Sequence, residues 1–488
     1  SGITLSKDGD IFATGVTTST TFVGNLTGNV TGNSDTATNS TNASHVLVTD
    51  NESTNENNLI TFVEDATSST GNVGLEMDGN LTYNPSTGTV SATAFSGDGS
   101  ALTGIGGTDF IHAEQISTTG IVTATSFAPT VGQFSHRNLV INGAMNVAER
   151  GTSSDVSSTA YGSVDRFQLE VAGLDNAVTM AQVDVSSGTT PYTEGFRKAL
   201  KLTNGDQTSV GNTDTMRILY KFEGQDIAQS GWNHKSSSSF ITLSFWVKSS
   251  VAQSFKVSFI AWDSATIRTF VFDTGSLSAD TWTKVTKTIP GDSNVTVDND
   301  TNNGFQISFY QYLGTNYTAS SGYIEDQWNA YQNPQTPDQT NTWFDTNDAT
   351  YELTGVQLEV GPVATPFEHR SFQDELLRCQ RYYYAHKGPL WGQTSAGDHL
   401  DLALYFPVPM RATPSFNQVD TSLLFKNRLD QGNSTSASTY SISGATNQYG
   451  AMWSARPASG ESWDTADGRI YYYHVPEGTT SYEWSAEL

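Results

Sequence analysis

The sequence predicts an all-β protein in which a repetitive fibrous part precedes two β-sandwiches joined by a short helix. Two observations support this fold class. Only 15% of the residues are charged and 36% are hydrophobic, with Gly, Ser, Thr and Asn filling the difference, which is typical of β-rich or fibrous chains. Short β-prone runs separated by turn residues recur along the chain, whereas helical periodicity occurs in a single stretch. We expect domains at residues 1–136, 137–366, 367–389 and 390–488.

The first part contains an internal repeat. Residues 5–28 and 75–104 share the core Leu-x-x-Asp-Gly-[Asp/Asn]-[Ile/Leu], and residues 120–127 match residues 88–95 in their small and apolar positions. Asp-Gly between β-prone runs indicates a hairpin, because the turn needs the positive φ that these residues tolerate. The repeat therefore predicts short strands joined by tight turns.

This repeat is too polar to fold as a single chain. Residues 1–136 hold no Trp and few large aliphatic residues, so one copy cannot offset about 1–2 kcal/mol of backbone entropy per residue. Three chains around a common axis would bury the apolar edge, which consists of Val16, Phe22, Val90, Phe95, Val122 and Phe127. We expect a homotrimeric β-shaft. A disordered Ser/Thr/Asn linker is the alternative, above all for residues 25–44.

The middle part has the pattern of a β-sandwich. Aromatic residues become frequent after Arg137, and short alternating runs recur at the spacing of such folds. In residues 241–248, apolar and mostly polar side chains alternate, as expected of a strand with one buried face. Asp165 and Arg166 are expected to form a structural pair. The expected strands are residues 138–147, 165–171, 216–222, 240–248, 255–261, 269–273, 281–289, 305–312 and 351–360.

A long connection without strand periodicity, residues 320–350, combines aromatic and amide side chains. Loops of this length are usually functional or disordered, and disordered tracts are poor in aromatic residues. Sugar-binding sites use this mixture, because aromatic faces stack on sugar C–H groups while Asn, Gln and Asp bond to hydroxyls. A turn at residues 459–468 holds a further candidate. The glycan-binding candidates are Tyr323, Trp328, Tyr331, Trp343 and Trp463; rings that pack on their own domain are the alternative.

An amphipathic helix is expected between the two sandwiches. Ser371 suits the N-cap position, and Asp374 follows in the first turn, where negative charge is favourable. The spacing predicts a helix over residues 372–384 that packs one face between domains or around a threefold axis. That face carries Phe372, Leu376, Cys379 and Tyr383.

Motifs around this helix resemble those of phage tail fibres. Residues 367–384, FEHRSFQDELLRCQRYYY, resemble the linker motif of such fibres. Residues 353–366, LTGVQLEVGPVATP, are similar to the closing strand of the jelly-roll domain that precedes this linker. Residues 406–414, FPVPMRATP, are similar to a strand and turn of the domain that follows it. The three motifs occur in the expected order.

Two further motifs extend the resemblance. Residues 138–153, NLVINGAMNVAERGTS, with VDRF at residues 164–167, resemble the start of a carbohydrate-binding-module-like jelly roll. Residues 83–105 resemble repeats of cyanophage tail fibres. The resemblance implies a homotrimeric bacteriophage fibre of the virion, assembled in the host cytoplasm. Its N-terminal end would contact other tail proteins, and its distal receptor-binding domain would adsorb to host bacterial glycans, either lipopolysaccharide or capsule.

Composition and missing motifs narrow the function classes. The net charge of −26 disfavours nucleic acid, and without a run of about 18 apolar residues or a signal segment we expect no membrane insertion or export. A single cysteine, Cys379, is expected to be a small buried hydrophobe. Motifs such as HExxH and GxSxG are absent, so we expect no enzyme.

Two alternative functions and one question about a cofactor stay open at this point. Because a glycosidase needs only two suitably spaced carboxylates, a tailspike-like polysaccharide depolymerase is one alternative. A purely structural neck or head fibre is another. No cofactor is expected, although the acidic turns at residues 8–10 and 298–303 leave structural calcium open.

Overall fold

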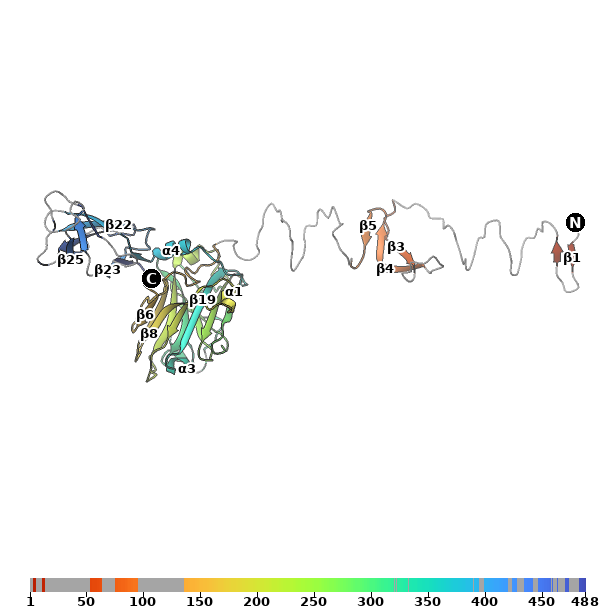
Figure 1. The fold of residues 1–488 in the computed structure, drawn as a ribbon. Coiled ribbons are helices and arrows are strands. Elements are labelled where there is room, and N and C mark those ends of the chain that lie inside the picture. The colour runs from red at the N-terminus through yellow and green to blue at the C-terminus, as the bar shows by residue number, and fades with distance from the viewer. Residues whose placement is uncertain are drawn as a thin grey trace. The chain divides into compact units, whose positions relative to one another are not determined.

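The computed structural model divides into two compact units, Ser1–Val122 and Thr123–Leu488, and each is described by itself (Figure 1). The domain limits expected within them stay predictions. Among the described residues, no helix is long and apolar enough to cross a membrane. The structure describes residues 3–5, 11–13, 53–63, 75–94, 136–319, 321, 323–331, 333–388, 390–394, 399–419, 424–427, 434–441, 446–457, 459, 463, 470–473 and 482–488.

The first unit contains two small antiparallel sheets. Strand β1 (Ile3–Leu5) pairs with β2 (Ile11–Ala13), and β4 (Leu75–Asn84) pairs with β3 (Asn58–Val63) and β5 (Thr89–Ser91). Strands β1 and β2 flank the first Asp-Gly pair, as predicted. In the second repeat the prediction is wrong, because the Asp-Gly pair lies inside β4.

The turn of the second repeat lies instead between β4 and β5. The Asn84 side chain accepts hydrogen bonds from the backbone N–H groups of Ser86 and Thr87, and Gly88 supplies a φ of 66°. An Asn side chain that bonds to the following backbone groups stabilises such a turn. The hairpin therefore forms where the asparagine and the glycine cooperate.

The sheet β3-β4-β5 has no interior. None of residues 53–63 and 75–94 is buried. Ile60 and Leu81 are half-buried. The other large apolar side chains are 40–72% exposed, namely Leu59, Phe62, Val63, Leu75, Met77, Tyr83 and Val90. The other residues of the predicted apolar edge, Val16, Phe22, Phe95, Val122 and Phe127, lie outside the described residues.

The second unit begins with two facing six-stranded antiparallel sheets. The first sheet has the order β17-β13-β12-β15-β10-β7, with strands Trp328–Ala330, Arg268–Asp273, Lys256–Ala261, Asn303–Leu313, Thr215–Glu223 and Phe167–Ala172. The second has the order β14-β11-β19-β9-β8-β6, with strands Thr283–Pro290, Phe240–Ser249, Thr350–Val360, Lys198–Thr203, Val178–Asp184 and Ser153–Val156.

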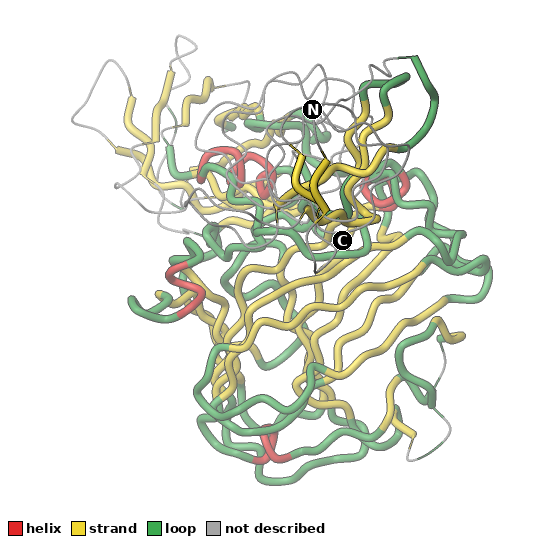
Figure 2. The backbone as a smooth tube through the Cα atoms, turned by 90° about the vertical axis from the view of Figure 1, so that its right-hand side faces the viewer, coloured by secondary structure: helices red, strands yellow, loops and turns green. Residues whose placement is uncertain are grey.

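Strands and loops make up most of this sandwich, and its helices are short (Figure 2). The helices are α1 (Thr190–Thr193), α2 (Gly224–Ala228) and α3 (Thr342–Asp345), and β16 (Thr318–Ala319) pairs with β18 (Thr336–Pro337). Between the sheets lies a core rich in Phe and Val, including Phe245 packed edge-on against Phe309. The predicted sandwich is thus confirmed.

Residues 138–147 form no strand, which corrects the expectation. Asn142 and Met145 have φ of 62° and 59°, outside the extended range of strands. Their segment crosses the end of the sandwich, and two backbone hydrogen bonds join it to β19: Leu139 N–H donates to Leu358 O, and Val356 N–H donates to Gly143 O. The apolar residues of this segment are buried by that crossing rather than by strand pairing.

The linker helix α4 (Phe372–Gln380) is shorter than predicted. Ser371 is the N-cap, as expected, and its Oγ accepts a hydrogen bond of 3.2 Å from Asp374 N–H. Cys379 is fully buried, which confirms that expectation, but Phe372 is 58% exposed and Leu376 is half-buried. Within one chain, helical spacing therefore overestimates the buried face, and burial of Phe372 around a threefold axis stays a prediction.

The predicted helix ends early because its last residues join a sheet. Tyr383 begins β20 (Tyr383–His386), which pairs with β28 (Tyr482–Ser485), and β28 also pairs with β23 (Ser415–Gln418). Tyr383 is buried in this sheet with its ring 3.6 Å from the Arg150 guanidinium.

The last part forms a closed barrel where we expected a sandwich of two sheets. The barrel order is β21-β22-β26-β25-β24-β27, with strands Leu390–Thr394, Leu400–Tyr405, Gly450–Pro457, Ser434–Ser441, Leu424–Asn427 and Ile470–Tyr473. Pairing of β21 with both β22 and β27 closes the sheet. Closure removes the free edges that a small open sheet would expose.

Candidate functional site

A groove crosses the outer face of the sheet that contains β10. Along β10, Met216, Ile218 and Tyr220 belong to the core, so the alternating residues Arg217 and Leu219 project from the opposite face. The groove has a volume of about 360 Å³. We call it the outer-face groove; its lining residues are Glu170, Arg217, Leu219, Lys221, Trp262, Asn303 and Gln306.

Arg217 is the fixed centre of the outer-face groove. Its Nε and Nη2 lie 2.7 and 2.6 Å from Oε1 of Glu170, the residue directly opposite it on β7. Nη1 donates to the hydroxyl of Tyr310 (3.2 Å) and to Oε1 of Gln335 (3.3 Å). These bonds satisfy a largely buried guanidinium and leave it little freedom to move.

Glu170 retains capacity to bind a ligand. Both contacts from Arg217 fall on Oε1, and the side chain is 30% exposed. Oε2 accepts no hydrogen bond from the part of the chain that the structure describes. A free carboxylate oxygen beside a fixed guanidinium is suited to accept a hydrogen bond from a hydroxyl group.

Trp262 forms the aromatic wall of the outer-face groove. It follows β12 directly and is half-buried. Its indole N–H lies 3.3 Å from Oε1 of Gln306, and 3.2 Å from the amide oxygen of Asn303 in the orientation that satisfies both ends of that amide. The two amides hold the indole by its N–H edge, beside the charged residues.

Lys221 lies at the end of the groove near the last residue of the sequence. Its Nζ donates a hydrogen bond of 2.8 Å to the carbonyl oxygen of Leu488. Burial lowers the pKa of Lys221, although Glu170 and Glu487 act in the opposite direction.

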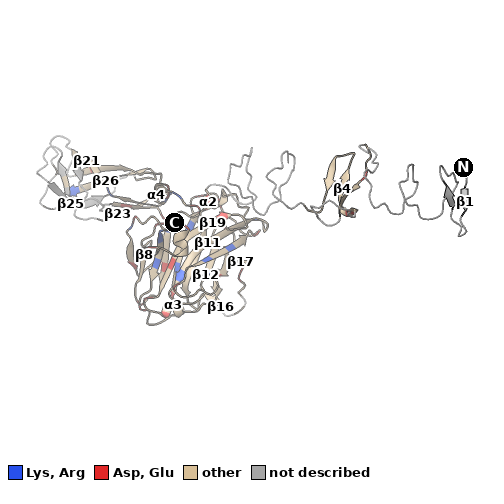
Figure 3. Ribbon diagram, turned by 45° about the vertical axis from the view of Figure 1, so that its right-hand side comes forward, with Lys and Arg blue, Asp and Glu red and all other residues tan. Residues whose placement is uncertain are grey.

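Figure 3 shows basic and acidic residues interspersed over the sandwich strands.

Of the five predicted glycan-binding residues, Tyr331 contacts an aromatic residue of the groove. Its ring centre is 5.7 Å from that of Trp262, a groove residue. Trp328 is half-buried against the core and donates its indole N–H to Pro290 O. Tyr323 is also half-buried, with a raised pKa caused mainly by burial. The predicted loop thus borders the groove but does not line it.

The prediction of Trp343 and Trp463 as sugar-stacking residues is wrong for this structure. Trp343 is fully buried in α3, donates its indole N–H to Thr350 O and meets Tyr351 edge-on. Trp463 is 5% exposed and packs edge-on against Phe425 in the barrel core. Each ring is part of a hydrophobic core formed by residues distant in the sequence. This burial is not indicated by the polar residues next to each tryptophan in the sequence.

Glu170, Arg217 and Trp262 were not predicted as site residues from the sequence. Glu170 and Arg217 each alternate with core residues along their strands, which marks them as outward-facing. Alternation cannot show that they meet, because their contact depends on the register in which Arg217 lies opposite Glu170. Trp262 directly follows β12, which pairs with β15, and β15 pairs with the strand β10 that carries Arg217. This strand order brings Trp262 to the same groove.

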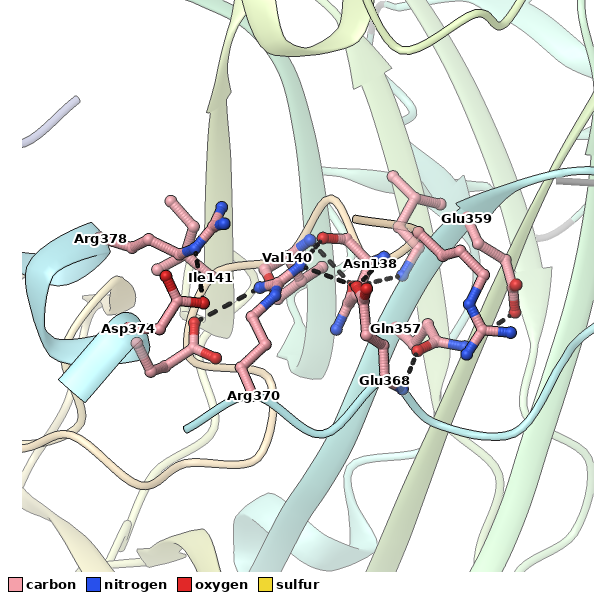
Figure 4. A network of polar contacts seen from close by, with 12 residues as sticks. Asn138, Val140, Ile141, Gln357, Glu359, Glu368, Arg370, Asp374 and Arg378 are labelled. Atoms are coloured by element: carbon pink, nitrogen blue, oxygen red, sulfur yellow. Dashed lines mark hydrogen bonds and ion pairs between the residues drawn. The ribbon is translucent and has the colours of Figure 1, made fainter. Parts of the chain in front are cut away.

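A second polar network, around Arg370, is structural (Figure 4). Arg370 donates to the carbonyl oxygens of Asn138 and Val140, and Glu368 accepts from Asn138 N–H at 2.9 Å. Glu368 N–H in turn donates to the Gln357 side chain on β19. These bonds fix the segment before α4 to the end of the sandwich.

Asp165 and Arg166 do not pair with each other, contrary to the prediction. Asp165 bonds to Arg150 at 3.2 Å, whereas Arg166 and Arg150 both bond to Glu487. Arg166 has a φ of 75°, so the backbone turns between the two residues. The Arg166 guanidinium also lies 3.4 Å from the ring centre of Tyr382.

Burial perturbs the carboxyl groups near this cluster. It raises the pKa of Glu149 to about 8, with Asp165 adding to the effect, and it raises the pKa of Asp165 to about 6 against the opposing charge of Arg150. Glu149 Oε1 accepts from the Gln380 side chain. Within the described ranges, no group of three or more His, Cys, Asp or Glu residues could hold a metal ion.

The facing antiparallel sheets define the middle of this chain as a jelly-roll β-sandwich of an all-β protein. No protein-family model and no curated protein sequence matches the chain. Among solved structures, the enzymatically active domain of bacteriophage CBA120 tailspike protein 4 aligns with a TM-score of 0.24 and 9% identity, over 46% of this chain and 21% of that one. This chain therefore spans about a fifth of the tailspike domain's length.

Two further structures are similar at the same level. A putative sugar binding protein from Bacteroides thetaiotaomicron has a TM-score of 0.24 and 11% identity, over 46% of this chain and 99% of that one. The CBM22-1–CBM22-2 tandem domain of Paenibacillus barcinonensis Xyn10C has the same score and identity, over 74% and 100%. At scores this low, none of these likenesses bears on the function of this chain.

Proposed function

We propose that this chain is a non-enzymatic glycan-binding fibre protein of a bacteriophage virion, active as a homotrimer that adsorbs to host surface polysaccharide. The observation that carries the proposal is the outer-face groove, in which an indole, a carboxylate with a free oxygen and side-chain amides meet on a rigid sheet. Aromatic surface with a few placed polar groups is the composition of a small-ligand site.

The composition of the groove favours binding over cleavage. Most glycoside hydrolases use two carboxyl groups on either side of the scissile bond. Among the described residues that line the outer-face groove, Glu170 is the one carboxylate. Its Oε1 is already engaged by Arg217, so we expect it to orient a hydroxyl group rather than to transfer a proton.

The exposed sheet of the first unit supports assembly into a trimer. Leu75 and Met77 are 72% and 61% exposed, and their strand contributes no buried residue. Burial of such side chains is worth about 25 cal/mol per Å² of apolar surface, which a copy of the same sheet would supply. A trimer would also present three grooves at once, so that weak sites gain avidity on a repeating polysaccharide.

The tail-fibre role rests on the motifs of residues 353–384 and 406–414 together with this site. We propose that the N-terminal end of the fibre attaches to other tail proteins. A purely structural fibre would have no need of a fixed guanidinium and an open carboxylate in one groove.

Binding of the full chain to purified host lipopolysaccharide and capsule tests the proposal. Trp262→Ala and Glu170→Gln should each weaken binding at least tenfold, while Tyr405→Ala, at an 87% exposed aromatic residue of the barrel, should leave it unchanged. Release of reducing sugar would favour the depolymerase instead. Unchanged adsorption in both groove variants would place binding elsewhere.

A further inference from the structure

A second cavity lies on the outer face of the other sheet of the sandwich. Its volume is about 550 Å³, within the range of small-ligand sites. Phe245 and Val247 of β11 belong to the core, so Trp246 between them projects outward, beside Lys284 of β14. We call this cavity the Phe367 pocket; it is lined by Glu194 at the C-cap of α1, by Lys284 of β14, by residues 364–367 and by His369.

One carboxylate organises the polar side of the Phe367 pocket. Oε2 of Glu194 accepts from the indole N–H of Trp246 at 3.1 Å and from Nζ of Lys284 at 3.2 Å. Glu194 and Lys284 are each 37% exposed, so both reach the cavity as well as each other. The pair places an acceptor and a donor of opposite charge at one wall.

His369 adds a third polar group. Its Nε2 lies 2.8 Å from the carbonyl oxygen of Glu194, and because a carbonyl oxygen can only accept, Nε2 carries the proton. In the neutral ring, Nδ1 is then an acceptor. The imidazole is held on one side by this bond and on the other by the ring of Phe367, whose centre is 4.9 Å away.

Phe367 supplies an apolar wall with a fixed orientation. Its ring meets Phe196 edge-on at 4.8 Å, and Phe196 is fully packed in the small core that includes Trp246. The neighbouring lining residues Ala364, Thr365 and Pro366 carry no charge. An aromatic ring, an ion pair and an imidazole therefore converge on one cavity.

We propose that the Phe367 pocket is a second ligand site, which takes a neutral, hydroxyl-rich ligand of the size of one sugar residue. Glu194 and Lys284 oppose each other in charge, so an anion would meet Glu194 and a cation would meet Lys284. Hydroxyl groups can donate to Glu194 and accept from Lys284 at the same time, while a C–H face rests on Phe367.

This site goes beyond the proposed function, because it shares no residue with the outer-face groove and lies on the other sheet. It would give each sandwich two separate contacts with a polysaccharide. Trp246 bonds to Glu194 in the pocket and Trp262 lines the groove, so each tryptophan reports on one site.

Fluorine NMR of the full chain labelled with 5-fluorotryptophan tests the inference. The chain contains ten tryptophans, and the signals of Trp246 and Trp262 are identified by their loss in the Trp246→Phe and Trp262→Phe variants. D-glucose, D-galactose and N-acetyl-D-glucosamine are titrated separately to their solubility limits. We expect at least one of them to produce a saturable shift of the Trp246 signal.

Two variants of the pocket and one control variant test whether the shift of the Trp246 signal comes from sugar binding in the Phe367 pocket. Phe367→Leu keeps an apolar side chain in the small core, and Lys284→Met keeps an aliphatic stem at an exposed position; both should abolish the shift. Lys287→Met makes the same substitution on β14 outside the pocket and should retain it. A Trp246 signal that no sugar moves, or that still moves in both pocket variants, would overturn the inference.

The groove and the pocket can fail separately in this experiment. Movement of Trp246 without Trp262 would support the Phe367 pocket and count against the groove. Movement of Trp262 alone would support the groove and overturn the pocket.

Discussion

The sheet β3-β4-β5 and the jelly-roll sandwich are both antiparallel, yet they differ in the burial of their apolar side chains. In the sandwich, Phe259 and Phe309 lie on adjacent strands and are both fully buried between two sheets. In the three-stranded sheet, Leu75 and Met77 are more than half exposed. Hydrogen-bonded strands alone are thus not enough; a second layer must cover the apolar face.

The contrast extends to polar groups. The sandwich can bury ions because neighbouring segments supply partners, as when Arg381 and Tyr382 both bond to the buried carboxylate of Glu223. In the first unit, described polar contacts such as Asn84 to Asn55 are exposed to solvent. The sandwich therefore buries its own apolar and charged side chains, whereas the described sheet β3-β4-β5 of the first unit leaves most of its side chains exposed.

The largest expected effect is on the free energy of unfolding of the sandwich, which has a core of its own. Trp343→Ala should lower the free energy of unfolding by about 3–5 kcal/mol, because it empties a fully buried site in the core. Denaturant unfolding followed by circular dichroism measures the change. Trp343→Phe, which refills most of the space, should recover much of it. A loss of glycan binding in Trp343→Ala without loss of stability would restore Trp343 as a binding residue.

The buried carboxyl groups predict a pH dependence of the sandwich. The pKa of Glu149 rises from its ordinary 4.5 to about 8, mainly through burial. Between these values the folded chain keeps a proton that the unfolded chain releases, so stability should fall as pH rises through this window. One pKa unit corresponds to about 1.4 kcal/mol.

Thermal unfolding at a series of pH values measures this dependence. Glu149→Gln should flatten the curve between pH 4.5 and 8, because the amide does not titrate. Glu487→Gln alters the same cluster without removing the Glu149 carboxyl and should leave that part of the slope in place. Stability that rises over this range in the wild type would contradict the assignment.

A smaller effect is expected at the linker. Ser371→Ala should cost about 1 kcal/mol, because the N–H of Asp374 loses the acceptor that caps α4. Ser371→Asp, which offers a carboxylate oxygen in the same place, should retain most of the stability. Equal losses in the two variants would mean that the cap bond contributes little.

The smallest effect on the sandwich is expected from changes in the first unit. Leu75→Ser combined with Met77→Ser should leave its unfolding unchanged, yet lower the mass of the assembly from three chains toward one. Sedimentation equilibrium measures the mass, and Glu76→Gln on the same strand is the matched control. A wild-type chain that is monomeric with an ordered first unit would contradict the trimer.

Much of the fold could be predicted from local patterns. The alternation in residues 241–248 anticipates β11, and the cap at Ser371 anticipates the start of α4. The end of α4 could not be predicted, because Tyr383 leaves the helix to pair with Ser485, about a hundred residues later in the chain. Helical spacing contains no information about such a distant partner.

Composition and short-range periodicity were enough to predict that the chain is all-β, that aromatic residues become frequent after Arg137 and that Cys379 is buried. By contrast, the position of Arg217 opposite Glu170 and the burial of Trp343 in the core are apparent only in the folded chain. Strand register and the closure of a core depend on residues far apart in the chain. Their contacts exist only when whole sheets have come together.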